Sequence, residues 1–174
     1  MLLHHARQPA RIDAHGALVP LDQQDRTVWN HKEIAEGVRI LRAALAKDRR
    51  GEYQLQAAIA AIHDDAPTAT ETDWPQILAW YDELVALTGN PAAVLSRAIA
   101  VGEVDGPLAG LLATDGLDAR MPGYHRLDAV RAQLHERAGH LAYAAELYAR
   151  AAATSRSSLE RDHLAKQAAR LRRP

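Results

Sequence analysis

Apolar residues recur at helical spacing along most of the chain, and this pattern predicts an all-α protein. A typical stripe consists of Ile34, Val38, Leu41 and Leu45, whose spacing places them on one face of a helix. The pattern and its breaks predict about eight helices, over residues 31–50, 52–65, 74–88, 91 to beyond 99, 107 to beyond 111, 124–137, 141–153 and 158–172. The connections are only a few residues long, so successive helices are expected to pack antiparallel.

Residues that cap or stop helices support several of these boundaries. Asn30, Asp73 and Ser157 stand where N-caps are expected, and a glutamate follows Asn30 and Ser157 three residues later, as in a capping box. Pro67 and Gly89 are expected to end the helices before them.

The first thirty residues follow no sustained period. Residues 1–7 form an apolar helical fragment without a cap, and they are expected to be the end of a longer, truncated helix. Residues 8–30, which contain Pro9, Gly16 and Pro20, are expected to be an irregular strap anchored by Trp29. Residues 31–174 are then expected to form the helical domain, and the whole chain one structural domain.

A repeat decides between helical architectures. Arg97-Ala98 recurs as Arg131-Ala132 at an offset of 34, which is the period of the tetratricopeptide repeat (TPR). The later unit also has small, turn and aromatic residues at the spacing of that repeat, namely Ala132, Gly139, Ala144, Tyr148 and Ala151. Antiparallel helix pairs stacked as a TPR-like α-solenoid are therefore expected, and an ordinary helical bundle is the alternative.

Composition narrows the possible functions. The chain has 174 residues and is rich in alanine, with 48% hydrophobic residues, 5% aromatic residues and no cysteine. The absence of cysteine excludes a disulfide scaffold, a cysteine-ligated zinc site, an iron–sulfur cluster and a thiol nucleophile. The apolar runs fall far short of the roughly 18 residues that a membrane span needs, so a cytoplasmic protein without membrane contact is expected.

The net charge of −1 hides a segregation along the chain. Residues 1–50, 51–120 and 121–174 carry net charges of +3, −9 and +5. The acidic middle is either a solvated helical surface or a face that holds a basic partner, and reversing Asp64, Asp65, Asp82 and Glu83 would separate these readings. No recognition motif accompanies the basic residues of the last helix, so direct nucleic-acid binding is not expected.

The sequence contains few residue patterns that are typical of catalytic or metal-binding sites. His135 and His140 are five residues apart with Gly139 between them, so they are expected on opposite faces and a shared metal ion is not expected. His63 is followed by two aspartates, but it stands at a helix C-terminus, where a histidine is favourable for structural reasons alone. Neither a phosphate-binding glycine loop nor a serine nucleophile motif is present. We therefore expect no enzyme activity and no cofactor.

Three aromatic residues stand on one predicted helix. Trp74 and Tyr81 share a face, whereas Trp80 is displaced from them. The group is either a local aromatic core or, at Trp80, an anchor for a partner.

Several segments together resemble a known family. The most specific are Gln56–His63 and Thr72–Ile77, and the others are residues 2–11 with Asp13, 21–26 with Trp29-Asn30, 81–87, 97–101, 106–111, 123–125 and 131–151. They resemble the C-terminal TPR-like extension of bacterial extracytoplasmic-function (ECF) RNA polymerase sigma factors. The chain departs from that pattern at Ser96 and Gly89-Asn90, and the promoter-binding and polymerase-binding regions of such factors have no counterpart in it.

The resemblance implies a regulatory role in transcription initiation. The parent protein would recruit RNA polymerase to promoters, and this extension would act through contacts with the parent's DNA-binding regions or with core polymerase. The alternative is a helical small-molecule sensor or enzyme with a pocket lined by aromatic residues and histidines. Candidate interaction or family-motif residues are Arg7, Arg11, Asp13, Gln56, His63, Asp73, Trp74, Trp80, Tyr81, Arg97, Tyr124 and His125.

Two subsets of these candidates have an expected structural role. Arg7, Arg11 and Asp13 are expected to form an ion-paired strap that holds the N-terminal loop against the helices, with ligand binding as the alternative. Gln56 and His63 lie seven residues apart on one helical face, where they either line a groove or satisfy buried backbone groups.

Overall fold

The computed structural model describes residues 1–47 and 50–172. Within these residues every regular secondary-structure element is an α-helix or a short 3₁₀ helix. Within the same described residues, β-type backbone pairing is limited to one isolated antiparallel bridge between Ile12 and Leu18. The predicted all-α, helical repeat-like fold is confirmed. The chain divides into two compact units, residues 1–89 and 90–174.

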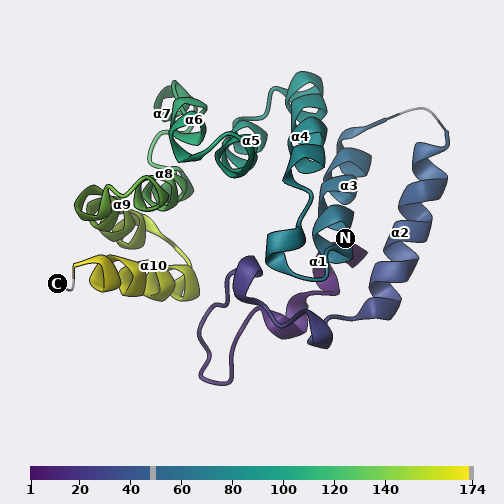
Figure 1. Ribbon diagram of the computed structural model, residues 1–174, viewed down its shortest axis with the longest axis horizontal. Coiled ribbons are helices and arrows are strands. Elements are labelled where there is room, and N and C mark those ends of the chain that lie inside the picture. The colour runs from purple at the N-terminus through teal and green to yellow at the C-terminus, as the bar shows by residue number, and fades with distance from the viewer. Residues whose placement is uncertain (48–49, 173–174) are drawn as a thin grey trace. The chain divides into compact units, whose positions relative to one another are not determined.

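The described residues of the first unit form four α-helices, labelled in Figure 1. They are α1 (Leu2–His5), α2 (His31–Leu45), α3 (Glu52–Asp65) and α4 (Trp74–Thr88). Between α1 and α2 the strap contains three short 3₁₀ turns, at Gln8–Ala10, Leu21–Gln23 and Arg26–Val28, and a fourth, Ala69–Glu71, precedes α4. Helix α3 packs against both α2 and α4, so it is the centre of this unit.

The caps of the first unit follow the sequence prediction. The Asn30 side chain accepts a hydrogen bond from the Glu33 N–H, and Asp73 accepts one from the Gln76 N–H. Gly89 ends α4 in the left-handed conformation at φ 58°, which glycine adopts without steric cost. The core beneath these helices includes Leu3, Trp29, Leu41, Leu55 and Ile77, all buried. Trp29 is thus the anchor of the strap, as predicted.

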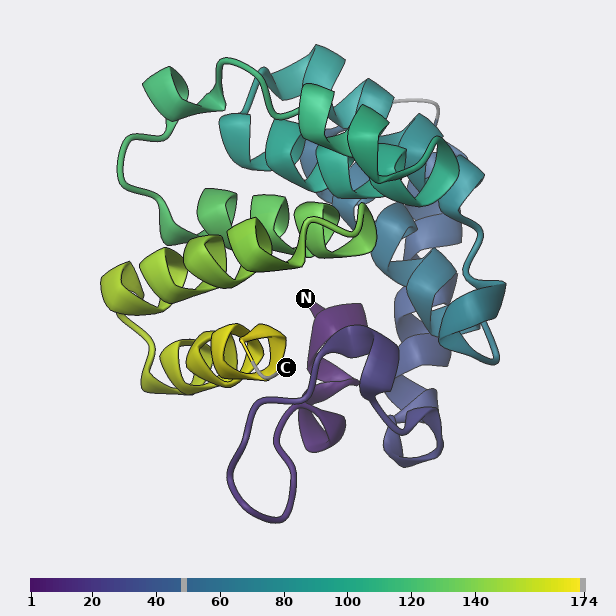
Figure 2. The same ribbon diagram turned by 60° about the vertical axis from the view of Figure 1, so that its left-hand side comes forward.

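The second unit contains six α-helices within its described residues (Figures 1 and 2). They are α5 (Pro91–Val104), α6 (Pro107–Leu112), α7 (Leu117–Arg120), α8 (His125–Arg137), α9 (Leu141–Thr154) and α10 (Ser158–Leu171). Helix α9 packs along α8 on one side and along α10 on the other, and α6 packs against α5 and α8. Figure 2 shows α8, α9 and α10 as three successive antiparallel layers.

The repeat of about 34 residues has a structural counterpart in the second unit. Ala98 and Ala132 are both fully buried, and their short side chains allow the helices to approach closely. Ion pairs that join residues 34 apart include Glu103 with Arg137 and then Glu136 with Arg170. The second pair is the first one displaced by 33 residues, so equivalent positions of successive repeats make equivalent contacts.

Buried side chains of the second unit gather in clusters, two of which include residues of α8. Ala132, Leu147, Tyr148, Ala151 and Leu164 belong to the cluster shared by α8, α9 and α10. The other cluster joins α5, α7 and α8 and consists of Leu95, Leu117, Leu127, Val130 and Leu134. The small and aromatic residues expected at α8 and α9 therefore pack as the repeat predicts.

The structure differs from the predicted elements at two places. Helix α2 ends at Leu45 rather than near residue 50, and residues 48–49 of the predicted helix lie outside the described part of the chain. Helix α7 was not predicted, because one turn of four residues is too short to show a period. Among the helices of residues 1–47 and 50–172, none is long and apolar enough to cross a membrane.

Candidate functional site

A buried ion pair joins the strap to α3 in the first unit. Arg7 Nε lies 3.3 Å from Asp64 Oδ1, and the two side chains are 6% and 0% exposed. These two atoms and Asp64 Oδ2 have no hydrogen-bond partner of good geometry, so the contact is mainly an attraction between charges. Because burying a charge is costly unless it is paired, each residue depends on the other for its place in the core.

Arg26 closes the C-terminal end of α3 beside this pair. Its Nη1 atom donates to the backbone oxygens of His63 at 2.5 Å and Ala66 at 2.7 Å, which have no partner within the helix. Its guanidinium lies 4.8 Å from the centre of the Trp29 ring, and that of Arg7 lies 5.9 Å from the same ring. Cation–π contacts thus connect both arginines to the anchor of the strap.

Burial shifts the titration of the two neighbouring groups on α3 in opposite directions. It raises the pKa of Asp64 from 3.8 to about 6, although Arg7 and Arg26 act against this shift. Burial also lowers the pKa of His63 from 6.5 to about 4, and the charges of Arg7 and Arg26 lower it further. The His63 ring packs edge-on against Trp74, with 5.3 Å between ring centres. Burial thus favours the neutral form of His63 and disfavours the charged form of the adjacent Asp64 carboxylate.

These shifts predict opposing effects of pH on stability. Between pH about 4 and about 6 the folded chain holds more protons at Asp64 than the unfolded chain does, so this group makes stability fall as pH rises. At His63 the unfolded chain holds more protons in the same interval, so this group makes stability rise with pH. In the wild-type protein the two slopes largely cancel.

We therefore expect single substitutions to expose one slope at a time. Asp64→Asn should leave a free energy of unfolding that rises with pH between about 4 and about 6 relative to wild type, and His63→Gln one that falls. Urea unfolding across this interval measures both slopes. His15→Gln, which changes an exposed loop residue, is the control. Parallel pH profiles for all four proteins would show that neither group titrates as described.

The other strap residues contact the local backbone. Arg11 Nη2 donates to the His4 carbonyl at 2.7 Å, and Asp13 Oδ1 accepts from the N–H groups of His15 and Ala17. Arg7 therefore holds the strap against the helices, with Asp64 as its partner. Gln56 is exposed and donates to Glu52 at 3.0 Å, whereas His63 is partly buried near the far end of the same helix, so the structure does not bring these two together.

The aromatic residues of α4 lie in different surroundings. Asp73 is the N-cap of this helix, Trp74 contacts His63, and Tyr81 is half-buried. Trp80 is also half-buried, and the Arg50 guanidinium lies 5.4 Å from the centre of its ring. Trp80 is therefore partly covered by the chain itself.

Two of the acidic residues proposed for charge reversal are already engaged. Asp64 is buried against Arg7, and both carboxylate oxygens of Glu83 accept hydrogen bonds from Arg50, at 2.7 and 2.8 Å. Reversing either charge would break a contact within the first unit. Asp65 is exposed and remains suitable for the electrostatic test.

In the second unit, Tyr124 and His125 lie at the start of α8. Tyr124 occupies the N-cap position, and its ring centre is 5.6 Å from that of His125. His125 Nε2 and Arg126 both contact the Glu160 carboxylate, at 2.8 and 2.5 Å, which ties α8 to α10. Arg97 is half-buried on α5. These candidates have structural partners, so their side chains are not evidence for a ligand.

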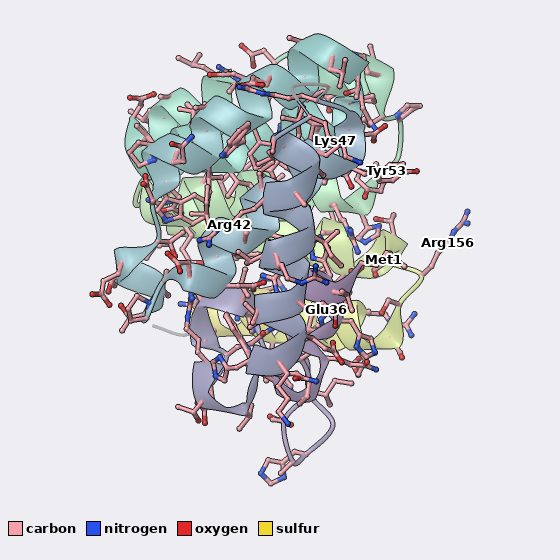
Figure 3. The ribbon with its side chains drawn as sticks, turned by 90° about the vertical axis from the view of Figure 1, so that its right-hand side faces the viewer. Met1, Glu36, Arg42, Lys47, Tyr53 and Arg156 are labelled. Carbon is pink, nitrogen blue, oxygen red and sulfur yellow. The ribbon has the colours of Figure 1, made fainter. Side chains whose placement is uncertain are left out.

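Each unit also has a surface groove with exposed hydrophobic side chains. The first groove has a volume of about 340 Å³ and lies among α1, α2 and α3, where Met1, Ile40 and Tyr53 are exposed. Figure 3 shows Met1 and Tyr53 on the same side of α2. The second groove, of about 410 Å³, lies among α6, α8 and α9.

The second groove combines apolar and polar groups. Leu108, Leu112 and Tyr143 are 59%, 70% and 48% exposed, and Leu108 and Leu112 lie one turn apart on α6. The polar lining residues include Asp115, Arg131 and His135. Arg131 is held in place by Asp118, to which it donates two hydrogen bonds at 2.7 and 2.8 Å. Two exposed leucines one turn apart thus line the groove beside an arginine that a salt bridge holds in place.

The expectation that His135 and His140 lie on opposite faces is wrong. Their Nδ1 atoms are 3.1 Å apart, because the chain turns back at Gly139. The His135 ring also packs edge-on against Tyr143, with 4.7 Å between ring centres. Within the described residues no group of three or more histidine or acidic side chains gathers around a common point.

Comparison with known proteins finds similarity to a family over the first part of the chain and to a longer protein over most of it. Residues 1–45 match a family of unknown function (DUF6596). An uncharacterized protein of Rhizobium meliloti (strain 1021) is 37% identical over 176 residues, which cover 97% of this chain and 42% of that protein. The chain thus spans less than half the length of this relative. No solved structure matches it.

Proposed function

We propose that this chain is a non-enzymatic regulatory domain of an ECF-type sigma factor, and that it acts by binding another segment of the same longer protein. The observation that carries this proposal is the second groove, where Leu108, Leu112 and Tyr143 are exposed side by side. Apolar residues one turn apart on a helix are suited to receive the apolar face of a second helix. The sigma-factor resemblance suggests the DNA-binding regions as its source.

The charge of the groove favours a basic occupant. Asp115 is exposed at the groove, and Arg131 in its lining is already paired with Asp118. Helices that bind DNA carry basic residues, which an acidic surface attracts. A relative of more than twice the length of this chain contains room for such regions. We therefore propose a basic amphipathic helix of the parent protein as the occupant.

Substitution of the exposed leucines tests this proposal in the parent protein. Leu108→Glu with Leu112→Glu should weaken the association of residues 1–174 with the rest of the parent, and should shift promoter-dependent transcription in the same direction as deletion of residues 1–174. Both leucines are largely exposed, so the variant is expected to fold. Leu87→Glu, which changes a 54% exposed leucine of α4, is the matched control.

Three outcomes distinguish the possible occupants. Loss of the contact within the parent supports the proposal, and added salt should weaken the same contact. Loss of binding to core RNA polymerase, with the contact inside the parent unchanged, would overturn it in favour of polymerase. Transcription and association that equal those of the Leu87→Glu control would overturn the role of the groove altogether.

A further inference from the structure

The turn between α8 and α9 fixes two histidines side by side. Gly139 has φ 82°, its N–H donates to the Glu136 oxygen at 3.0 Å, and the His140 N–H donates to the His135 oxygen at 2.9 Å. This pair of hydrogen bonds defines a Schellman motif, in which the residues at the positions of His135 and His140 regularly touch. Hydrophobic side chains usually make that contact, but here two imidazoles make it.

The distance between the two rings suits a metal ion. Zinc binds imidazole nitrogen at about 2.0–2.1 Å, so two adjacent ligands are separated by about 2.9 Å in octahedral geometry and by about 3.3 Å in tetrahedral geometry. The Nδ1 atoms of His135 and His140 are 3.1 Å apart, between these two values. Imidazole is a preferred ligand of Zn²⁺, Cu²⁺ and Ni²⁺.

We propose that His135 and His140 chelate a divalent transition-metal ion at the edge of the second groove. Each histidine contributes Nδ1, and water fills the remaining positions. Without metal, one ring donates its Nδ1 proton to the other. On binding, that ring changes to the tautomer protonated at Nε2, so both Nδ1 lone pairs face the ion and no proton leaves the protein.

The surroundings favour the neutral form that metal binding needs. Burial lowers the pKa of His135, and the nearby charges of His140 and Arg131 lower it further. Arg131 is paired with Asp118, which reduces the repulsion between its charge and a bound cation. His135 lines the second groove together with Tyr143, so the open positions of the ion are accessible from that groove.

Zinc titration of the whole chain tests the histidine pair directly. Competition with a chromogenic chelator at neutral pH should give one site that is at least about tenfold weaker in His135→Gln or His140→Gln, since even losing a supporting group around a metal typically costs 10–100-fold in affinity. His15→Gln changes an exposed histidine of the strap and should leave the affinity unchanged. Thermal unfolding would establish that each variant is folded.

Substitution of Gly139 tests the turn while both ligands remain. A Cβ atom at this position meets no atom within 4 Å, so the positive φ is the main obstacle to a side chain. Asparagine tolerates this conformation and valine does not, so Gly139→Asn should keep zinc affinity and Gly139→Val should lower it. Equal zinc affinity in wild type and in the double variant His135→Gln with His140→Gln would overturn the proposal. Because it uses this chain alone, the experiment is independent of the proposed role in transcription.

Discussion

Replacement of Arg7 by methionine is expected to lower the free energy of unfolding by about 3–5 kcal/mol, because it leaves the Asp64 carboxylate buried without a partner. The Asp64 side chain is 0% exposed, so water cannot replace the lost guanidinium. The cost should be greatest above pH about 6, where Asp64 is charged, and smaller below it. Urea unfolding at two pH values measures both effects.

Two further variants separate the ion pair from simple loss of packing. Arg7→Met combined with Asp64→Leu should recover most of the lost stability, since replacing a whole buried pair with apolar residues is often neutral. Arg11→Met, which changes an exposed arginine of the same strap, should have a small effect. If Arg7→Met costs no more than Arg11→Met, the pair does not hold the strap in place.

Substitution of Gly110 by alanine is expected to destabilise the second unit by about 1–3 kcal/mol, as overpacking does. A Cβ atom there would lie 2.9 Å from Gly102 Cα and 2.9 Å from the Ala98 oxygen, which are backbone atoms of α5 and cannot move aside alone. Alanine is otherwise favoured over glycine within a helix, so helix propensity predicts the opposite sign. Chemical denaturation of the whole chain decides between the two.

Gly102 provides the matched control for this prediction. A Cβ atom at Gly102 would approach the Leu134 Cδ2 atom at 2.5 Å, but its nearest backbone neighbour is 3.8 Å away. The end of the leucine side chain can adjust, so Gly102→Ala should cost less than Gly110→Ala. A Gly110→Ala variant as stable as wild type would show that α5 and α6 are not in such close contact.

The sequence predicted most helices because their signals are local. Asn30, Asp73 and Ser157 each cap a helix by accepting a hydrogen bond from the N–H three positions later, and Gly89 ends α4 by its own conformation. The 34-residue period also predicts equivalent positions correctly, because Ala98 and Ala132, which are 34 residues apart, are both buried. Helix α7 escaped prediction because its single turn contains no repeat of apolar positions.

The contacts within the candidate sites depend on how the chain folds back on itself, which the local hydrophobic pattern does not determine. Arg7 and Asp64 are separated by most of the first unit in sequence, and they meet only because the strap folds back onto α3. Asp64 therefore resembled a surface charge. Helical spacing does not predict the contact between His135 and His140, because the chain leaves the helix at Gly139, between the two residues. A Schellman turn at that glycine would have predicted the contact.

The function proposed above, regulation through protein contacts in a sigma-type parent, is tested most directly by promoter-dependent transcription. RNA polymerase would be assayed with the intact parent, with the parent lacking residues 1–174, and with the variant carrying Leu108→Glu and Leu112→Glu. We predict that both changes alter transcript yield in the same direction, whereas Leu87→Glu does not. Equal yields from all four proteins, or a parent that recruits no polymerase, would contradict the proposed function.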